Sequence, residues 1–146
     1  MHSRSIYSYD DDWTAAFRDQ LLGLSRAVEA SLPHLVETKG TIVTTAAFSV
    51  RSPELVRLPY ASLKGAVALY TKGIAKAYGK HGVRANCIAP GAIETDALAG
   101  MRKQISEARG WDYDTALERV MVEEWGMHVA LTRPGKPNEV GDLIAF

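Results

Sequence analysis

A strand, a long helix and a second strand follow one another along the middle of the chain, and this order limits its possible folds more than any other feature. Residues 41–47 and 83–89 are short runs rich in apolar or β-branched side chains, as buried strands are. Between them, apolar residues recur at helical spacing over 60–77. Strands joined by a helix run parallel, with a right-handed crossover. The pattern therefore predicts an α/β fold built on a parallel sheet.

Further helices are expected before and after this unit. The aspartates at 10–12 are suited to cap a helix with apolar residues at helical spacing, and Pro33 is expected to close it. After the second strand, the spacing predicts helices over 96–109 and 114–125 and the start of another at Glu139.

Two glycines interrupt the long central helix. Gly65 and Gly73 each cost stability relative to alanine. We therefore expect something to pack closely against that side of the helix, either the backbone of the sheet or a second subunit.

Length and charge narrow the class of protein. The chain has 146 residues, enough for one compact domain. Its 17 basic residues balance 17 acidic ones, so neither nucleic acid nor a membrane surface is expected as a partner. The single cysteine, Cys87, cannot form an intrachain disulfide, which favours a reducing, cytoplasmic setting. The histidines do not have the spacing of metal ligands, so no metal site is expected at His34, His81 or His128.

A tyrosine and a lysine stand four residues apart at the start of the central helix. Pro59 suits a helix start, and Tyr60 and Lys64 then share one helical face, with the ammonium beside the phenol. An unperturbed phenol titrates near pH ~10, and a cation held close favours its ionised form. The loops after parallel strands meet at the edge of the sheet where ligands bind. The pair predicts proton transfer during redox chemistry on a carbonyl or alcohol.

Five segments, taken together, resemble the short-chain dehydrogenase/reductase family of the classical type. In the family's order and spacing, they are residues 13–23, 40–47, 60–64, 84–95 and 133–140. They run almost the length of the chain and correspond to the C-terminal half of that fold. The resemblance implies an oxidoreductase that transfers hydride between NAD or NADP and a small-molecule carbonyl or secondary alcohol.

The resemblance also implies roles for individual residues. Tyr60 matches the family's general acid/base, and Lys64 matches the lysine that holds the cofactor ribose and lowers the pKa of the tyrosine. The family loop that borders the nicotinamide end of the cofactor matches Pro90, Gly91, Ile93 and Thr95.

The chain departs from the family pattern at two positions. Ala47 stands thirteen residues before Tyr60, where the family has a serine that hydrogen-bonds the reacting oxygen, and a methyl group cannot donate that bond. Ser49 or Thr45 is a possible substitute, and Ser49 is the better candidate because it lies past the end of the strand. Gln20 aligns with the family's proton-relay asparagine and carries its amide on a longer arm.

The resemblance covers only part of the family fold. It implies one partial domain over 1–146, a doubly wound Rossmann-type parallel sheet that lacks the N-terminal nucleotide-binding half and the last strand. Residues 96–132 match a helical substrate lid, although the apolar spacing fits a simple core equally well. Unpaired sheet edges recruit other chains, so we expect a homo-oligomer or a complementary half as partner. The alternative is a truncated, catalytically degenerate member that acts only through such contacts.

Overall fold

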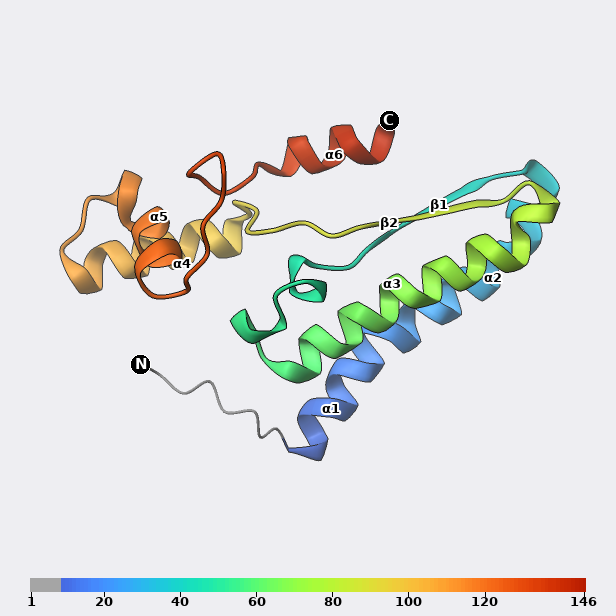
Figure 1. Cartoon of the computed structure of the whole chain (residues 1–146), viewed down its shortest axis with the longest axis horizontal. Helices are drawn as coiled ribbons and strands as arrows, with labels where there is room; N and C mark the ends of the chain where they lie inside the picture. Colours follow the sequence, from blue (N-terminus) through green and yellow to red (C-terminus); the bar gives the residue numbers. More distant parts are fainter. Residues whose placement is uncertain (1–8) are drawn as a thin grey trace. The chain divides into compact units, whose positions relative to one another are not determined.

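The computed structural model describes residues 9–146, in which the backbone divides into two compact units. The first unit ends at Ala89, and the second is Pro90–Phe146. Both strands and the long central helix belong to the first unit, whereas the second consists of helices and loops (Figure 1).

The first unit contains the predicted parallel strands. β1 (Thr41–Thr45) pairs in parallel with β2 (Arg84–Ile88), in a register that runs from Thr41 opposite Arg84 to Thr45 opposite Ile88. α3 (Leu58–Tyr78) connects the two strands and packs on both of them. The predicted strand–helix–strand unit is confirmed, and the parallel pairing follows from the length of the crossover.

The N-terminal helical region differs from the expectation at its end. α1 (Asp10–Ala16) continues through a π-helical segment, η1 (Phe17–Leu22), into α2 (Gly23–Thr38). Pro33 lies inside α2, so the prediction that it closes the helix is wrong. An interior proline removes one backbone hydrogen bond and strains the turn before it, yet α2 continues past Pro33 to Thr38.

The cap of α2 lies at Lys39 and Gly40. Lys39 adopts the left-handed conformation with φ 51°, and the Gly40 N–H donates to the Leu35 carbonyl at 2.8 Å. A Cβ on Gly40 would lie 2.5 Å from Leu35 Cδ2, so a larger residue there would require the Leu35 side chain to move. The helix therefore ends where the backbone can reverse, five residues beyond the proline, rather than at the proline itself.

The glycines of α3 also differ from the expectation. A Cβ on Gly65 or Gly73 would meet no other atom of the described chain within 4 Å. The sheet therefore does not pack against them, and that half of the prediction is wrong. Leu69, halfway between the two glycines on the same face, is 71% exposed.

The second unit begins with a loop and continues through three helices, α4 (Asp96–Arg109), α5 (Tyr113–Glu123) and α6 (Pro137–Ala145). α4 and α5 pack together, and Leu117, Val120 and Met121 of α5 are buried. These buried side chains lie at the contact between the two helices. Within residues 9–146, no helix combines the length and apolar character needed to cross a membrane.

A buried pair of hydroxyls fastens α3 to β1. Thr44 Oγ1 and Thr71 Oγ1 lie 2.7 Å apart, and both residues are buried. Thr71 also donates to the Val67 carbonyl at 2.8 Å. Because Thr71 has one hydroxyl proton and gives it to Val67, Thr44 must be the donor in the pair.

We predict that Thr71→Val destabilises the chain, because it leaves the buried Thr44 donor without an acceptor. The expected loss in free energy of unfolding is about 1–3 kcal/mol, measured by urea denaturation. Thr38→Val is a matched control, since exposed Thr38 donates to the His34 carbonyl at 2.8 Å and should change stability by less than about 0.5 kcal/mol. Equal effects of the two substitutions would contradict the prediction.

Candidate active site

Tyr60 and Lys64 lie one turn apart at the N-terminal end of α3. Pro59 occupies the first turn, and the Ala61 N–H donates to the Arg57 carbonyl at 3.1 Å as the helix begins. Lys64 Nζ lies 5.7 Å from the centroid of the Tyr60 ring, so the structure places the two functional groups together. Tyr60 is 37% exposed and remains open to a ligand.

The ammonium group of Lys64 is also tied to the sheet. Lys64 Nζ donates to the carbonyl of Thr45, the last residue of β1, at 3.0 Å. The parallel strands bring this carbonyl to the edge of the sheet where α3 begins. The hydrogen bond fixes the lysine relative to both elements.

The electrostatics of the pair run opposite to the expected direction. Burial raises the pKa of Tyr60. Burial also lowers the pKa of Lys64, with a smaller opposing contribution from Cys87. The predicted lowering of the tyrosine pKa by the lysine is therefore not found, because loss of hydration disfavours the phenolate.

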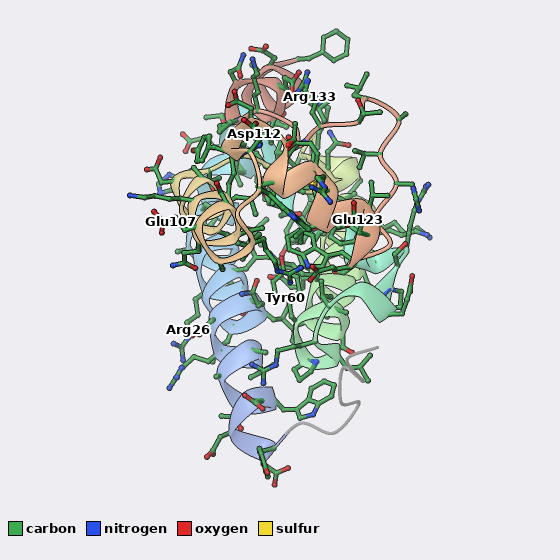
Figure 2. The ribbon with its side chains drawn as sticks, turned by 90° about the vertical axis from the view of Figure 1, so that its left-hand side faces the viewer. Arg26, Tyr60, Glu107, Asp112, Glu123 and Arg133 are labelled. Atoms are coloured by element: carbon green, nitrogen blue, oxygen red, sulfur yellow. The ribbon has the colours of Figure 1, made fainter. Side chains whose placement is uncertain are left out.

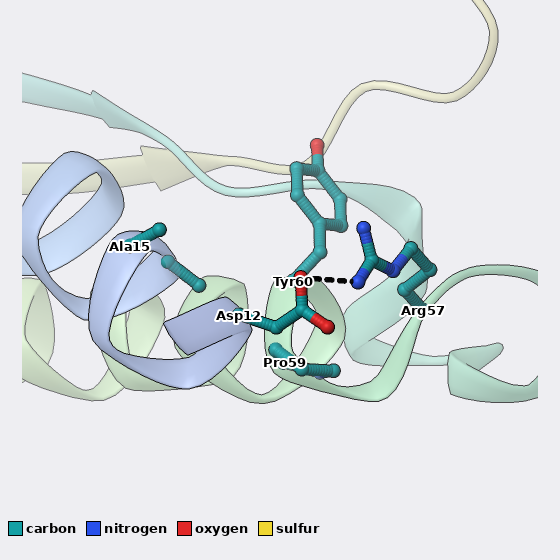
Figure 3. A pocket seen from close by; sticks show the side chains of 6 residues that line it. Asp12, Ala15, Arg57, Pro59 and Tyr60 are labelled. Carbon is teal, nitrogen blue, oxygen red and sulfur yellow. Dashed lines mark ion pairs between the residues drawn. The ribbon is translucent and has the colours of Figure 1, made fainter. Parts of the chain in front are cut away.

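A small pocket adjoins Tyr60 (Figure 3). Its volume is about 190 Å³, and its lining comes from α1 and the start of α3: Asp12, Ala15, Ala16, Arg57, Pro59 and Tyr60. Arg57 Nη2 and Asp12 Oδ1 form an ion pair of 2.6 Å beside it. Figure 3 shows that the Tyr60 hydroxyl points away from this ion pair.

Ser49 lies just beyond β1, in the 3-10 turn Phe48–Val50 that packs on α3. It is 1% exposed, and its Oγ has no hydrogen-bond partner among the described residues. Ala47, at the family's serine position, is also buried. The serine proposed as a substitute donor is thus a buried hydroxyl with its hydrogen-bonding capacity unused.

Gln20 lies in the π-helical segment η1, which packs on α3. π-helical turns are rare in proteins, and many of those that do occur lie at functional sites. Helical periodicity alone did not indicate this segment, because the apolar spacing around it fits an ordinary α-helix.

The loop predicted to border a cofactor lies in the second unit. Ile93 forms a parallel bridge with Gly135, and Thr95 precedes α4 as its N-cap residue. A Cβ on Gly135 would lie 2.8 Å from Ile93 Cδ1, so a larger residue there would require the Ile93 side chain to move. Pro90 and Gly91 open the loop, and a Cβ on Gly91 would meet no described atom within 4 Å.

Sequence reasoning missed Arg102, the buried cation of the second unit. It is 4% exposed and binds the carboxylates of Glu94 and Glu118. The signal that would have found it is its position on α4, where it falls between Leu98 and Ile105 on the apolar side of the helix. No group of three or more metal-ligating side chains occurs within residues 9–146.

Known sequences match most of the chain. A family model described as enoyl-(acyl carrier protein) reductase matches residues 2–146. L-fucose dehydrogenase from Rattus norvegicus is 33% identical over 128 residues, which are 88% of this chain and 44% of that protein. Meso-2,3-butanediol dehydrogenase from Serratia marcescens is 29% identical over 93% of this chain and 48% of its own length. The chain spans about half the length of the curated relatives it matches.

Solved structures share the fold. L-sorbose reductase from Gluconobacter frateurii, in complex with NADPH and L-sorbose, has a TM-score of 0.85 at 23% identity, over 97% of this chain and 52% of that one. A 3-oxoacyl-[acyl-carrier protein] reductase from Brucella melitensis with bound NAD has a TM-score of 0.70 at 27% identity, over 94% and 45% of the respective chains. The predicted partial Rossmann-type fold is confirmed.

We predict that the Tyr60 phenol titrates above its ordinary value of about 10 in the ligand-free chain. The difference in phenolate absorbance between the wild type and Tyr60→Phe isolates this group. Because folding raises the pKa, the phenol contributes stability below pH ~10 that is lost as the pH rises through the folded-state pKa. A midpoint at or below the ordinary value would contradict the prediction.

Proposed function

This chain belongs to the short-chain dehydrogenase/reductase family of oxidoreductases, and on that premise we propose that it transfers hydride between a nicotinamide cofactor and a small carbonyl compound or secondary alcohol. The observation that carries the proposal is the Tyr60 and Lys64 pair at the open N-terminal end of α3. The cytoplasmic setting is part of the proposal, supported by the lone thiol of Cys87.

The described residues fit the ribose end of NAD or NADP. An ammonium has three donors, and the Thr45 carbonyl accepts only one from Lys64, so two remain for the ribose hydroxyls. The nicotinamide supplies or accepts the hydride when bound. Pro90, Gly91, Ile93 and Thr95 are proposed to border it, and the open space at Gly91 supports a close approach of backbone to ligand.

Tyr60 is proposed as the general acid/base. A phenol is protonated at neutral pH, so its Oη can donate a proton to a carbonyl oxygen during reduction. In the oxidative direction the phenol must accept a proton, and the nearby charge of Lys64 then favours the phenolate.

Ser49 and Gln20 complete the proposed machinery. A buried hydroxyl without a partner costs about 1–3 kcal/mol, which a substrate oxygen would recover by accepting its hydrogen bond. The unused Ser49 hydroxyl is of this kind and supports its role as donor to the reacting oxygen. Gln20 is proposed as the relay amide, and its place in a π-helical turn supports a functional role. Residues 96–132 are proposed as the substrate lid.

The alternative is a catalytically degenerate family member that acts only through oligomer or partner contacts. Ala47 favours it, because the family's serine position carries a methyl group. Turnover of reduced nicotinamide with small ketones distinguishes the two functions, since a degenerate member would turn over none of them.

A homo-oligomer or a complementary half is proposed as the protein partner. The outer face of α3 carries Leu69 at 71% exposure between Gly65 and Gly73, and nothing in the described chain lies against the two glycines. Small residues at this spacing let a second helix approach closely. A second copy of the chain would bury this face.

We predict that Tyr60→Phe lowers turnover by about 10²–10⁴-fold, because the general acid/base is lost. Ser49→Ala should lower it by about 10²–10³-fold through loss of a donor to the reacting oxygen. The assay follows oxidation of NADH and NADPH with small ketones. Tyr70→Phe, on the same helix, is the control and should keep wild-type turnover; undiminished activity of Tyr60→Phe would overturn the mechanism.

We predict that Leu69→Lys reduces self-association, because a charge placed on the α3 face opposes its burial. Light scattering after size exclusion should show a mass above the monomer for the wild type and a lower mass for the variant. Leu131→Lys is the matched control, since Leu131 is 70% exposed and lies in a loop of the second unit. A monomeric wild type, or equal effects of both variants, would contradict this interface.

A further inference from the structure

The guanidinium of Arg102 joins three segments of the second unit. Arg102 Nε donates to Glu94 Oε1 at 2.9 Å. Its Nη1 and Nη2 donate to the two carboxylate oxygens of Glu118, each at 2.8 Å. Nη1 also reaches the carbonyls of Asp114 at 2.8 Å and Tyr113 at 3.3 Å. The Arg102 side chain is 5% exposed, whereas the side chains of Glu94 and Glu118 are 34% and 24% exposed.

The hydrogen bonds of Arg102 have two roles, because some of them fix the plane of the guanidinium and another points at the preceding loop. The two-pronged pairing with Glu118 and the carbonyls at the start of α5 set the plane of the guanidinium. Once that plane is set, the Nε–H points at Glu94 in the preceding loop. Pairing with the carboxylates, chiefly the hydrogen bond to Glu118, raises the pKa of Arg102, so its charge is permanent.

Glu94 belongs to the loop that is proposed to border the nicotinamide. Its neighbours Ile93 and Thr95 are two of the proposed cofactor residues. Its backbone N–H donates to the Gly135 carbonyl at 2.8 Å, and the Gly135 N–H donates to the Ala92 carbonyl at 2.9 Å. The loop is thus held through its backbone by Gly135 and through the Glu94 side chain by Arg102.

We propose that Arg102 is a positioning residue that, through Glu94, fixes the backbone of Ile93–Thr95 and couples it to α5. The proposal rests on the proposed function, because it assigns the coupling to the cofactor loop of that same site. A buried ion pair is a poor way to stabilise a helix pair, since apolar residues of similar volume often do so equally well. The arginine instead makes hydrogen bonds of fixed direction, which a leucine at this position cannot make.

The coupling has a consequence for a ligand that contacts α5. A shift of α5 moves Glu118 and the carbonyls of Tyr113 and Asp114, and the guanidinium bound to them must follow. The guanidinium in turn carries Glu94 and the loop. Substrate contact with α5 and placement of the cofactor loop are therefore linked by one side chain.

Amide hydrogen exchange of the full, ligand-free chain tests the coupling without requiring activity. Glu94→Ala should speed exchange at the Glu94 and Thr95 amides roughly tenfold or more, while α5 keeps its protection because Arg102 still binds Glu118. Glu94→Gln retains an acceptor and should restore most of the protection. Arg119→Met is the control, because Arg119 pairs with exposed Glu123 at 3.2 Å on α5 and lies 3.9 Å from the centroid of the Trp111 ring, so its partners are outside Ile93–Thr95 (Figure 2 labels Glu123). Unchanged exchange at Glu94 and Thr95 in Glu94→Ala would overturn the proposal.

Titration with NADH and NADPH then tests whether the fixed loop matters for binding. Glu94→Ala should weaken cofactor affinity about tenfold, with recovery in Glu94→Gln and no change in Arg119→Met. Wild-type affinity in a Glu94→Ala chain whose loop exchange has risen would overturn the positioning role. If the wild type binds neither cofactor, the proposed function of this chain fails, and the exchange result alone decides whether Arg102 fixes the loop.

Discussion

Parallel pairing of β1 with β2 is the constraint on which the first unit depends. Parallel strands end at the same edge of a sheet, and the helix that connects them must return to the opposite edge before the second strand begins. α3 therefore starts where β1 ends, which brings Lys64 against the last carbonyl of that strand. The buried Thr44 and Thr71 hydroxyls then hold the helix at one fixed position along the strand.

Burial favours the neutral form of the titratable groups in both units, but the outcome differs between Lys64 and Arg102. Around Tyr60 and Lys64, burial is partial and favours the neutral form of each group. At Arg102 the guanidinium is more completely buried, yet it is charged because two carboxylates and two carbonyls accept its hydrogen bonds. The difference lies in the number of partners, since a buried charge is tolerated only when its donors are satisfied. The Ser49 Oγ has no hydrogen-bond partner among the described residues, so no hydrogen bond offsets the cost of its burial.

The sequence predicted the order and type of the elements well, because each depends on short-range spacing. Both strands, α3 and α4 follow directly from apolar periodicity and from the position of Pro59. Prediction from the sequence failed where a feature depends on contacts that form only in the folded chain. Pro33 is retained within α2 because Gly40 caps the helix later, and the pKa of Tyr60 depends on how much water the fold removes. Arg102 was missed because its partners are brought to it only by the packing of α4 on α5.

The π-helical segment η1 changes how positions can be compared between this chain and its relatives. A π turn holds more residues than an α turn, so it acts as an insertion without a loop. Consider a relative that has an unbroken α-helix in this region. An ungapped alignment that starts from Trp13 and one that starts from Val28 then pair Gln20 with different residues of that relative. A shared function at this position is therefore defined by the direction of the side chain, and an ungapped alignment can pair residues that face different sides of the helix.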